Sequence, residues 1–122
     1  MTEQQQAMGI LDPAALENLR EMIGGDDAFL QELIDTFLGE APQLLADMRQ
    51  AVENEDAPLL RRAAHTLKSN SAEFGAMTLS SLCKQLEAMG KAGTLEGAAE
   101  MVTQAEAEYE QVKTALKTTL PG

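Results

Sequence analysis

Apolar residues recur along this 122-residue chain at the spacing of amphipathic helices, and no stretch alternates with the two-residue period of a strand. The longest such pattern follows Asp26 and repeats at i, i+3 and i+4: Phe29, Leu30, Leu33, Ile34, Phe37, Leu38, Ala41, Leu44, Leu45, Met48 and Val52. Pro42 lies inside this pattern and cannot donate a hydrogen bond to the carbonyl of Leu38, so we expect a kink or a break there. The pattern predicts an all-α protein.

Aspartates suited to helix capping predict where three of the helices start. They are Asp12, Asp26 and Asp56, whose side chains can accept from backbone N–H groups of the first turn. Pro13 and Pro58 follow two of them, at positions where the first turn tolerates a residue without an N–H. Asp12 therefore opens a short first helix, Asp26 a long second one, and Asp56 a third.

Glycines predict where the helices end. Gly24 and Gly25 close the first helix, and Gly75 closes the third because glycine readily adopts the left-handed conformation of many helix ends. Gly90 and Gly93 are expected to break the fourth helix, whose apolar stripe is Leu79, Leu82, Cys83, Leu86 and Met89. The last helix is expected to start from Thr94 as its cap, with the stripe Leu95, Ala98, Ala99, Val102, Ala105, Tyr109, Val112 and Leu116.

Four long amphipathic helices with short connections predict an antiparallel up-down-up-down four-helix bundle, with the short first helix across one end. The chain is long enough for one domain with a real core, and no linker divides it. We expect residues 1–11 to form a flexible N-terminal segment and residues 12–119 to form the bundle.

Composition excludes several classes of function. The net charge of −11 argues against a nucleic-acid-binding protein, which would carry a basic surface. No apolar run approaches the roughly 18 residues of a membrane span, and the polar start from Met1 to Met8 has no signal-peptide pattern. One cysteine cannot form an internal disulfide and suits a reducing compartment. We therefore expect a cytoplasmic protein that binds neither nucleic acid nor membrane.

The charge is unevenly distributed along the sequence. Residues 57–91 hold five basic and two acidic residues, a net charge of +3, whereas the remainder holds four basic and eighteen acidic residues, a net charge of −14. The segment is either a chance cluster on a solvated face or a patch that attracts an acidic partner or a phosphoryl group.

The only histidine of the chain, His65, lies within this cationic segment. If Leu67 marks the centre of the buried face of its helix, His65 points almost directly away from the core. Its neighbours on that face are Arg61, Lys68, Ser69 and Ala72. An outward imidazole between cations and small side chains is unusual for packing and suits a nucleophile that a large partner must reach.

Other chemistries lack the residues that they require. The chain has no glycine-rich phosphate loop and no second signal for a serine–histidine–carboxylate triad. His65 and Cys83 cannot by themselves make a structural zinc site, so we expect no metal and no cofactor. Reversible phosphoryl transfer to the imidazole remains, with Lys68 one turn away to neutralise the phosphoryl oxygens.

The run from Ala63 to Ala76 resembles the signature of histidine-containing phosphotransfer (HPt) domains. His65 matches the phosphorylated histidine, Lys68 the adjacent lysine, and Gly75 the glycine that ends the site helix. One departure is Ser69, where many members have glycine, and the larger side chain narrows the approach of a partner loop. The likeness extends through the segments 29–37 and 79–87 and covers most of the chain from about Asp12.

The resemblance implies roles for the following helix. In this family a Gln or Glu there often bonds to the imidazole and a basic residue one turn later borders the site, positions that Glu87 and Lys91 match. Lys84, Glu87 and Lys91 share one helix face, which supports the assignment independently. A pairing of Glu87 with Lys84 or Lys91 within its own helix is an equally open alternative.

The resemblance also implies a phosphocarrier rather than a self-sufficient enzyme. HPt domains pass a phosphoryl group between aspartates of response-regulator receiver domains, and the receiver supplies the acidic pocket and Mg²⁺. The expected partners are such receivers and/or a hybrid sensor histidine kinase, with the chain acting as a monomer. We expect the contact surface for the partner to centre on His65. Its border is formed by Arg61, Ser69, Ala72, Gly75, Lys84 and Lys91. Apolar positions of the first two helices would extend the contact: Leu16, Ile23 and Phe37.

Three alternatives remain at this point. The chain could be an HPt domain that a chemotaxis-type histidine kinase phosphorylates directly. It could be a helical adaptor that binds a partner through the cationic segment without phosphorylation. A bundle that uses His65 to bind a metal ranks third, because competent ligand partners are absent from the sequence.

Overall fold

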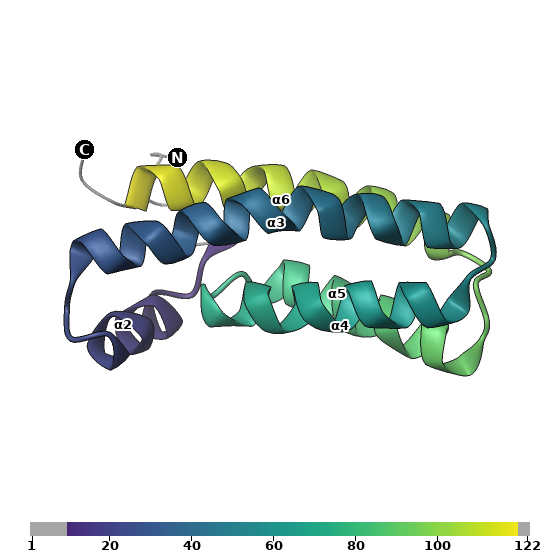
Figure 1. Ribbon diagram of the computed structural model, residues 1–122, viewed down its shortest axis with the longest axis horizontal. Helices are drawn as coiled ribbons and strands as arrows, with labels where there is room; N and C mark the ends of the chain where they lie inside the picture. Colours follow the sequence, from purple (N-terminus) through teal and green to yellow (C-terminus); the bar gives the residue numbers. More distant parts are fainter. Residues whose placement is uncertain (1–9, 120–122) are drawn as a thin grey trace.

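The computed structural model describes residues 10–119, which form an all-helical bundle (Figure 1). Its helices are α2 (Pro13–Met22), α3 (Asp27–Glu53), α4 (Ala57–Glu73), α5 (Met77–Ala92) and α6 (Ala98–Thr119). The four long helices alternate in direction along the long axis, and the short α2 lies at one end (Figure 1). The predicted up-down-up-down four-helix bundle with a short additional helix is confirmed.

Three helices start at the predicted aspartates. The side chain of Asp12 accepts from the N–H of Ala14 at 3.0 Å, and that of Asp26 accepts from the N–H of Phe29 at 3.1 Å. Asp56 caps α4 in the same way, through the N–H of Leu59 at 3.1 Å. Each carboxylate satisfies a backbone donor that has no partner within the helix.

The start of α2 is fixed to the turn between α4 and α5. The N–H of Asp12 donates to the carbonyl of Gly75 at 2.8 Å, and Gly75 has a φ of +81°. A Cβ at this glycine would lie 2.7 Å from the carbonyl oxygen of Asp12, so both conformation and space require glycine there. Leu11, which the sequence placed in the N-terminal segment, is 2 % exposed and belongs to the core. Residues 1–9 of that predicted segment lie outside the described part of the chain.

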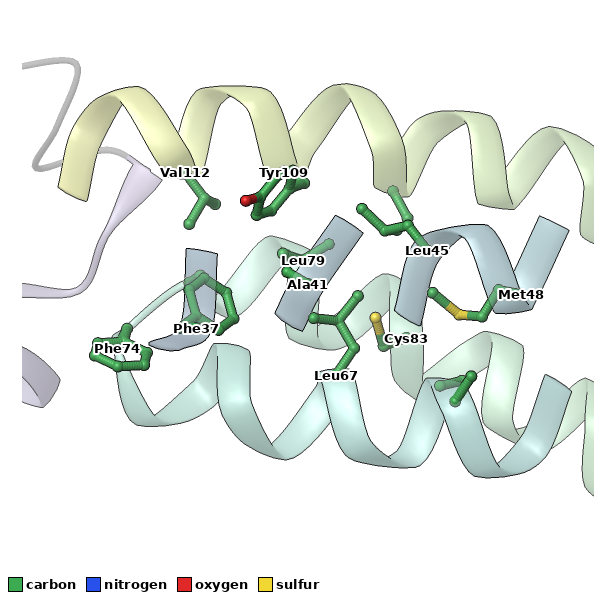
Figure 2. Close-up of a cluster of buried hydrophobic side chains, with 14 of the residues drawn as sticks. Phe37, Ala41, Leu45, Met48, Leu67, Phe74, Leu79, Cys83, Tyr109 and Val112 are labelled. Carbon is green, nitrogen blue, oxygen red and sulfur yellow. The ribbon is translucent and has the colours of Figure 1, made fainter. Parts of the chain in front are cut away.

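The core is a single apolar cluster along the bundle axis, to which every helix contributes. Figure 2 shows part of this cluster, where side chains from the four long helices meet. Near the α2 end, the ring of Phe37 lies 5.0 Å from that of Phe74 and 6.2 Å from that of Tyr109, measured between centroids. Cys83 is buried in the cluster, and burial raises the pKa of its thiol to about 12. The prediction that Phe37 contributes to a partner contact is therefore wrong, because its apolar ring is more stable within the core than in water.

Pro42 does not break α3, which runs without interruption from Asp27 to Glu53. The proline leaves the carbonyl of Leu38 without its usual helical donor. The hydroxyl of Tyr109, from α6, donates to that carbonyl at 3.2 Å. Burial also raises the pKa of Tyr109, which keeps the hydroxyl protonated as a donor. A contact from another helix therefore compensates for the bond that Pro42 cannot make.

Two helix boundaries differ from the prediction. Gly90 lies within α5, and the helix ends only at Gly93, which has a φ of +74°. A Cβ at Gly90 would lie 2.7 Å from the backbone nitrogen of Arg61, so this glycine allows α4 and α5 to approach closely. The last helix starts at Ala98 rather than after Thr94, because Gly97 has a φ of +84° and a right-handed helix cannot pass through that conformation. Between residues 10 and 119, no helix has both the length and the apolar character needed to cross a membrane.

Candidate functional site

The side chain of His65 lies on the outer face of α4, where 61 % of its surface is exposed. Leu67, two residues later on the same helix, is fully buried in the core. This arrangement follows from helical geometry, because residues two positions apart point to nearly opposite sides of an α-helix. The imidazole is thus accessible from solution, as the apolar pattern of α4 predicts.

Glu87 joins His65 and Lys68 into one network across α4 and α5. Its Oε2 lies 2.6 Å from Nδ1 of His65, and its Oε1 lies 2.5 Å from Nζ of Lys68. The hydrogen bond from Lys68 is the main cause that lowers the pKa of Glu87; burial opposes it, and His65 adds to the lowering. The carboxylate is therefore ionised at neutral pH and holds two donors from the neighbouring helix.

This contact determines which imidazole nitrogen is available. An ionised carboxylate only accepts hydrogen bonds, so Nδ1 of His65 carries a proton and donates it to Glu87. In the neutral ring the remaining nitrogen, Nε2, then has a free lone pair. Within residues 10–119 no hydrogen-bond partner holds Nε2. The arrangement presents a nucleophilic nitrogen to the outside.

The packing of α4 against α5 explains why Glu87 meets these residues. The Oγ of Ser80 donates to the carbonyl of Lys68 at 3.0 Å, which ties the start of α5 to α4. At the other end of α5, the backbone at Gly90 approaches the backbone of α4 at Ala57 and Arg61. These two close approaches fix the register between the helices, and Glu87 faces His65 within it.

The pairing of Lys68 with Glu87 was not predicted from the sequence. Of the two pairings considered for Glu87, the structure forms the one with His65, and in its described part neither Lys84 nor Lys91 makes an ion pair. The position of Lys68, three residues after His65, places it on the same helix face and was the available signal. That spacing does not show how far α5 is shifted along α4, so the sequence did not predict the ion pair.

The other predicted site residues differ in how far they are buried. Four have exposed side chains on α4 or α5: Arg61, Ser69, Lys84 and Lys91. Ala72 is half-buried. Gly75 is buried against Asp12, so the expectation that it borders a partner is wrong, and its position serves the turn between α4 and α5. Of the predicted apolar contacts, Leu16 and Ile23 remain partly exposed.

No cluster of three or more potential metal ligands, from His, Cys, Asp and Glu, occurs in residues 10–119. Two such residues, His65 and Glu87, are in contact. Lys68 occupies the second oxygen of that carboxylate, and a cation there disfavours a metal ion. The geometry is suited to nucleophilic chemistry at Nε2 and to binding of an anion nearby.

Comparison with known proteins agrees with this geometry. The family model described as Hpt domain matches residues 32–115. Histidine-containing phosphotransfer protein 2 of Arabidopsis thaliana is 26 % identical over 112 residues, covering 89 % of this chain and 72 % of the relative. The phosphorelay protein LuxU of Vibrio harveyi is 30 % identical over 87 residues, covering 71 % of this chain and 75 % of the relative.

A solved structure shows the same fold. The crystal structure of histidine-containing phosphotransfer protein B (HptB) from Pseudomonas aeruginosa PAO1 superimposes with a TM-score of 0.81 at 32 % sequence identity. The match covers 90 % of this chain and 93 % of HptB. The chain therefore belongs to the Hpt domain family, as a histidine phosphotransfer intermediate of phosphorelays.

Proposed function

We propose that His65 is the residue that carries the phosphoryl group, and that the group is attached to Nε2. The observation that carries this proposal is the hydrogen bond of 2.6 Å between Nδ1 and Glu87, which leaves Nε2 as the exposed nucleophile. His65 is also the only histidine among the 122 residues, so a histidine phosphotransfer protein of this sequence offers no other imidazole.

The transfer requires no general base. The lone pair of Nε2 attacks the phosphorus of an aspartyl phosphate, an N–P bond forms, and the P–O bond to the aspartate breaks. The aspartate leaves as a carboxylate with the bonding electrons, and the ring becomes cationic because Nδ1 keeps its proton. The ionised carboxylate of Glu87 then faces a positive ring and stabilises it. The reverse reaction returns the phosphoryl group to a second aspartate.

Lys68 is proposed to stabilise the charge of the phosphoryl group. Its ammonium already lies at the site, held by Glu87, and its flexible stem allows the ammonium to turn toward phosphoryl oxygens. Positive charge next to a transferring phosphoryl group lowers the barrier because the group is anionic throughout the reaction. The variant Lys68→Ala is expected to transfer more slowly with its fold intact.

The remaining requirements are assigned to the partner. We propose that receiver domains of response regulators supply the acidic pocket and the Mg²⁺, and that a hybrid sensor histidine kinase can lie upstream. The chain would act as a monomeric carrier in the cytoplasm, without an ATP site of its own. An exposed nucleophile on a helix surface supports this division, because a partner's active site can close over it.

The experiment is incubation of the chain with a ³²P-phosphorylated receiver domain, followed by chemical tests of the label. Wild type is expected to take up label that is acid-labile and base-stable, whereas His65→Gln takes up none at equal helicity. A second arm replaces the receiver with a chemotaxis-type kinase and ATP, and separates the two donor classes. No uptake by wild type from either donor, or equal uptake by His65→Gln, would overturn the proposal.

A further inference from the structure

Lys68 on α4 is bound to α5 twice, through its backbone and through its side chain. Its carbonyl accepts from the Oγ of Ser80 at 3.0 Å, and its Nζ donates to Oε1 of Glu87 at 2.5 Å. Both hydrogen bonds are partly buried. One residue of α4 thus connects the start of α5 to the carboxylate that faces His65.

The directions of the groups on a helix explain how one residue makes both contacts. Carbonyl groups point toward the C-terminal end of an α-helix, whereas side chains lean toward its N-terminal end. Because α4 and α5 run in opposite directions, the carbonyl of Lys68 faces the start of α5 and its side chain faces a later turn. Ser80 and Glu87 are seven residues apart, which places them on one face of α5 and about 10 Å apart along its axis.

The hydrogen bond from Ser80 differs in kind from the close contact at the other end of α5. A Cβ at Gly90 would lie 2.7 Å from the nitrogen of Arg61 and 2.9 Å from the carbonyl oxygen of Ala57. Steric contacts of this sort limit how closely two helices pack. A hydrogen bond also specifies a direction, because it weakens steeply when its distance and angle change. Ser80 therefore restrains the position of α5 along α4.

The contact between Glu87 and His65 tolerates little displacement. Its oxygen lies 2.6 Å from Nδ1, and a shift of about 1 Å would take the pair outside the range of a hydrogen bond. Without that acceptor, the proton of the neutral ring is no longer held on Nδ1. A ring that carries its proton on Nε2 has no lone pair there and cannot attack phosphorus.

We propose that Ser80 is a positioning residue for phosphoryl transfer, because its hydroxyl holds α5 where Glu87 meets Nδ1 of His65. The inference rests on the proposed function, since it concerns which ring nitrogen attacks the phosphorus. Ser80 bonds to Lys68 rather than to the ring, so it acts through Lys68 and Glu87. Its loss should consequently lower kcat at saturating receiver and leave KM unchanged.

The test measures transfer from a ³²P-phosphorylated receiver domain to Ser80→Ala, with three comparison variants. Ser81→Ala removes an exposed hydroxyl one position further along α5, and Ser80→Thr keeps a hydroxyl at the position. Tyr109→Phe removes a hydrogen bond from a side chain to the backbone on the α3–α6 side, and controls for lost stability. In Ser80→Ala, kcat is expected to fall about three- to fivefold, the factor by which one neutral hydrogen bond shifts an equilibrium. Ser81→Ala and Tyr109→Phe should stay within about twofold of wild type, and Ser80→Thr should recover most of the loss.

A second readout needs no partner. Long-range ¹H–¹⁵N spectra of the unphosphorylated chain show which nitrogen of His65 carries the proton. Wild type, Ser81→Ala and Tyr109→Phe are expected to hold it on Nδ1, whereas Ser80→Ala should show a mixture with Nε2. The spectra report on folded molecules, so a uniform loss of stability does not change them.

Two results would overturn the inference while leaving phosphorylation of His65 intact. One is a Ser80→Ala variant with the kcat and the proton position of wild type, which would make the hydroxyl purely structural. The other is an equal fall in kcat for Tyr109→Phe, which would attribute the loss to stability. Failure of wild type to take up label would instead remove the proposed function, and the proton position would still test the role of Ser80.

Discussion

The α3–α6 pair and the α4–α5 pair lie on opposite sides of the bundle (Figure 1). They differ in whether their polar side chains have partners within the protein. Between α3 and α6, Arg49 donates to the carbonyl of Ala99, to Thr103 and to Glu106, and Tyr109 donates to Leu38. On α4 and α5, four cations have no acidic partner in the described chain, and the histidine presents a free nitrogen.

The difference is between polar groups that have partners inside the protein and cations that are open to solvent. A polar group that has its partners inside the protein contributes to stability, and its loss is measured as a change in the free energy of unfolding. An exposed, unpaired cation contributes little to that free energy, and its loss is measured with a partner present. The α3–α6 pair thus uses its polar groups within the fold, whereas four of the five cations without an ion pair to a described residue lie on α4 and α5.

Alanine substitutions at Gly90 and at Gly39 are expected to give the largest difference in the free energy of unfolding. Gly90→Ala places a Cβ 2.7 Å from the backbone of Arg61, and separating α4 from α5 is expected to cost about 2 kcal/mol in the free energy of unfolding. Gly39 lies in α3 with nothing within 4 Å of an added Cβ, so Gly39→Ala is expected to stabilise by about 0.5–1 kcal/mol. Urea denaturation of both variants measures the contrast. Similar free energies would show that the α4–α5 contact can relax.

Tyr109→Phe tests whether the α3–α6 face depends on its polar contacts. The variant keeps the ring against Phe37 and removes the hydroxyl that donates to Leu38. Because Pro42 leaves that carbonyl without another helical donor, the free energy of unfolding is expected to fall by about 1–2 kcal/mol. In the double variant Tyr109→Phe/Pro42→Ala the restored helical N–H should recover part of the loss. If it recovers nothing, the hydroxyl does not serve the carbonyl.

The site network should make stability depend on pH. The folded pKa of Glu87 is lowered, first by the hydrogen bond from Lys68, and so lies below the unfolded value of about 4.3. Its contribution is therefore complete above that pH and is lost as the pH falls through the folded pKa. Glu87→Gln should therefore lose less stability than wild type as the pH falls below about 4.3. Parallel unfolding curves for the two proteins across this range would contradict the assignment.

Two serines give the smallest contrast, on the α4–α5 side itself. The Oγ of Ser71 is buried without a hydrogen-bond partner among the described residues, so Ser71→Ala is expected to leave stability unchanged or to raise it by up to about 1 kcal/mol. The Oγ of Ser80 donates to the carbonyl of Lys68, and Ser80→Ala is expected to cost about 1 kcal/mol. Thermal denaturation followed by circular dichroism compares them; equal losses would mean that Ser71 has an internal partner.

The features predicted correctly from the sequence are those that depend on neighbours in the chain. Asp12, Asp26 and Asp56 cap helices because their partners lie two or three residues away. The outward direction of His65 follows from the helical period alone. Such features are settled before any helix packs against another.

Most of the errors concern features that depend on how the helices pack; the late start of the last helix, set by the conformation of Gly97, is an exception. Gly90 was expected to break a helix, yet it lies within α5, and its lack of a side chain allows α5 to pack closely against α4. Phe37 was expected at a surface, yet it packs against Phe74 and Tyr109. The pair between Lys68 and Glu87 needs the register of α4 against α5, which no local pattern contains. A sequence period gives the direction of a side chain but not the residue that it meets.

The position of the phosphoryl group on His65 tests the central claim most directly. The ¹⁵N-labelled chain is phosphorylated by a receiver domain and examined by long-range ¹H–¹⁵N and ³¹P spectra of the imidazole. The account predicts phosphorus coupled to Nε2, with a proton retained on Nδ1 toward Glu87. Phosphorus on Nδ1, or on any residue other than His65, would contradict it.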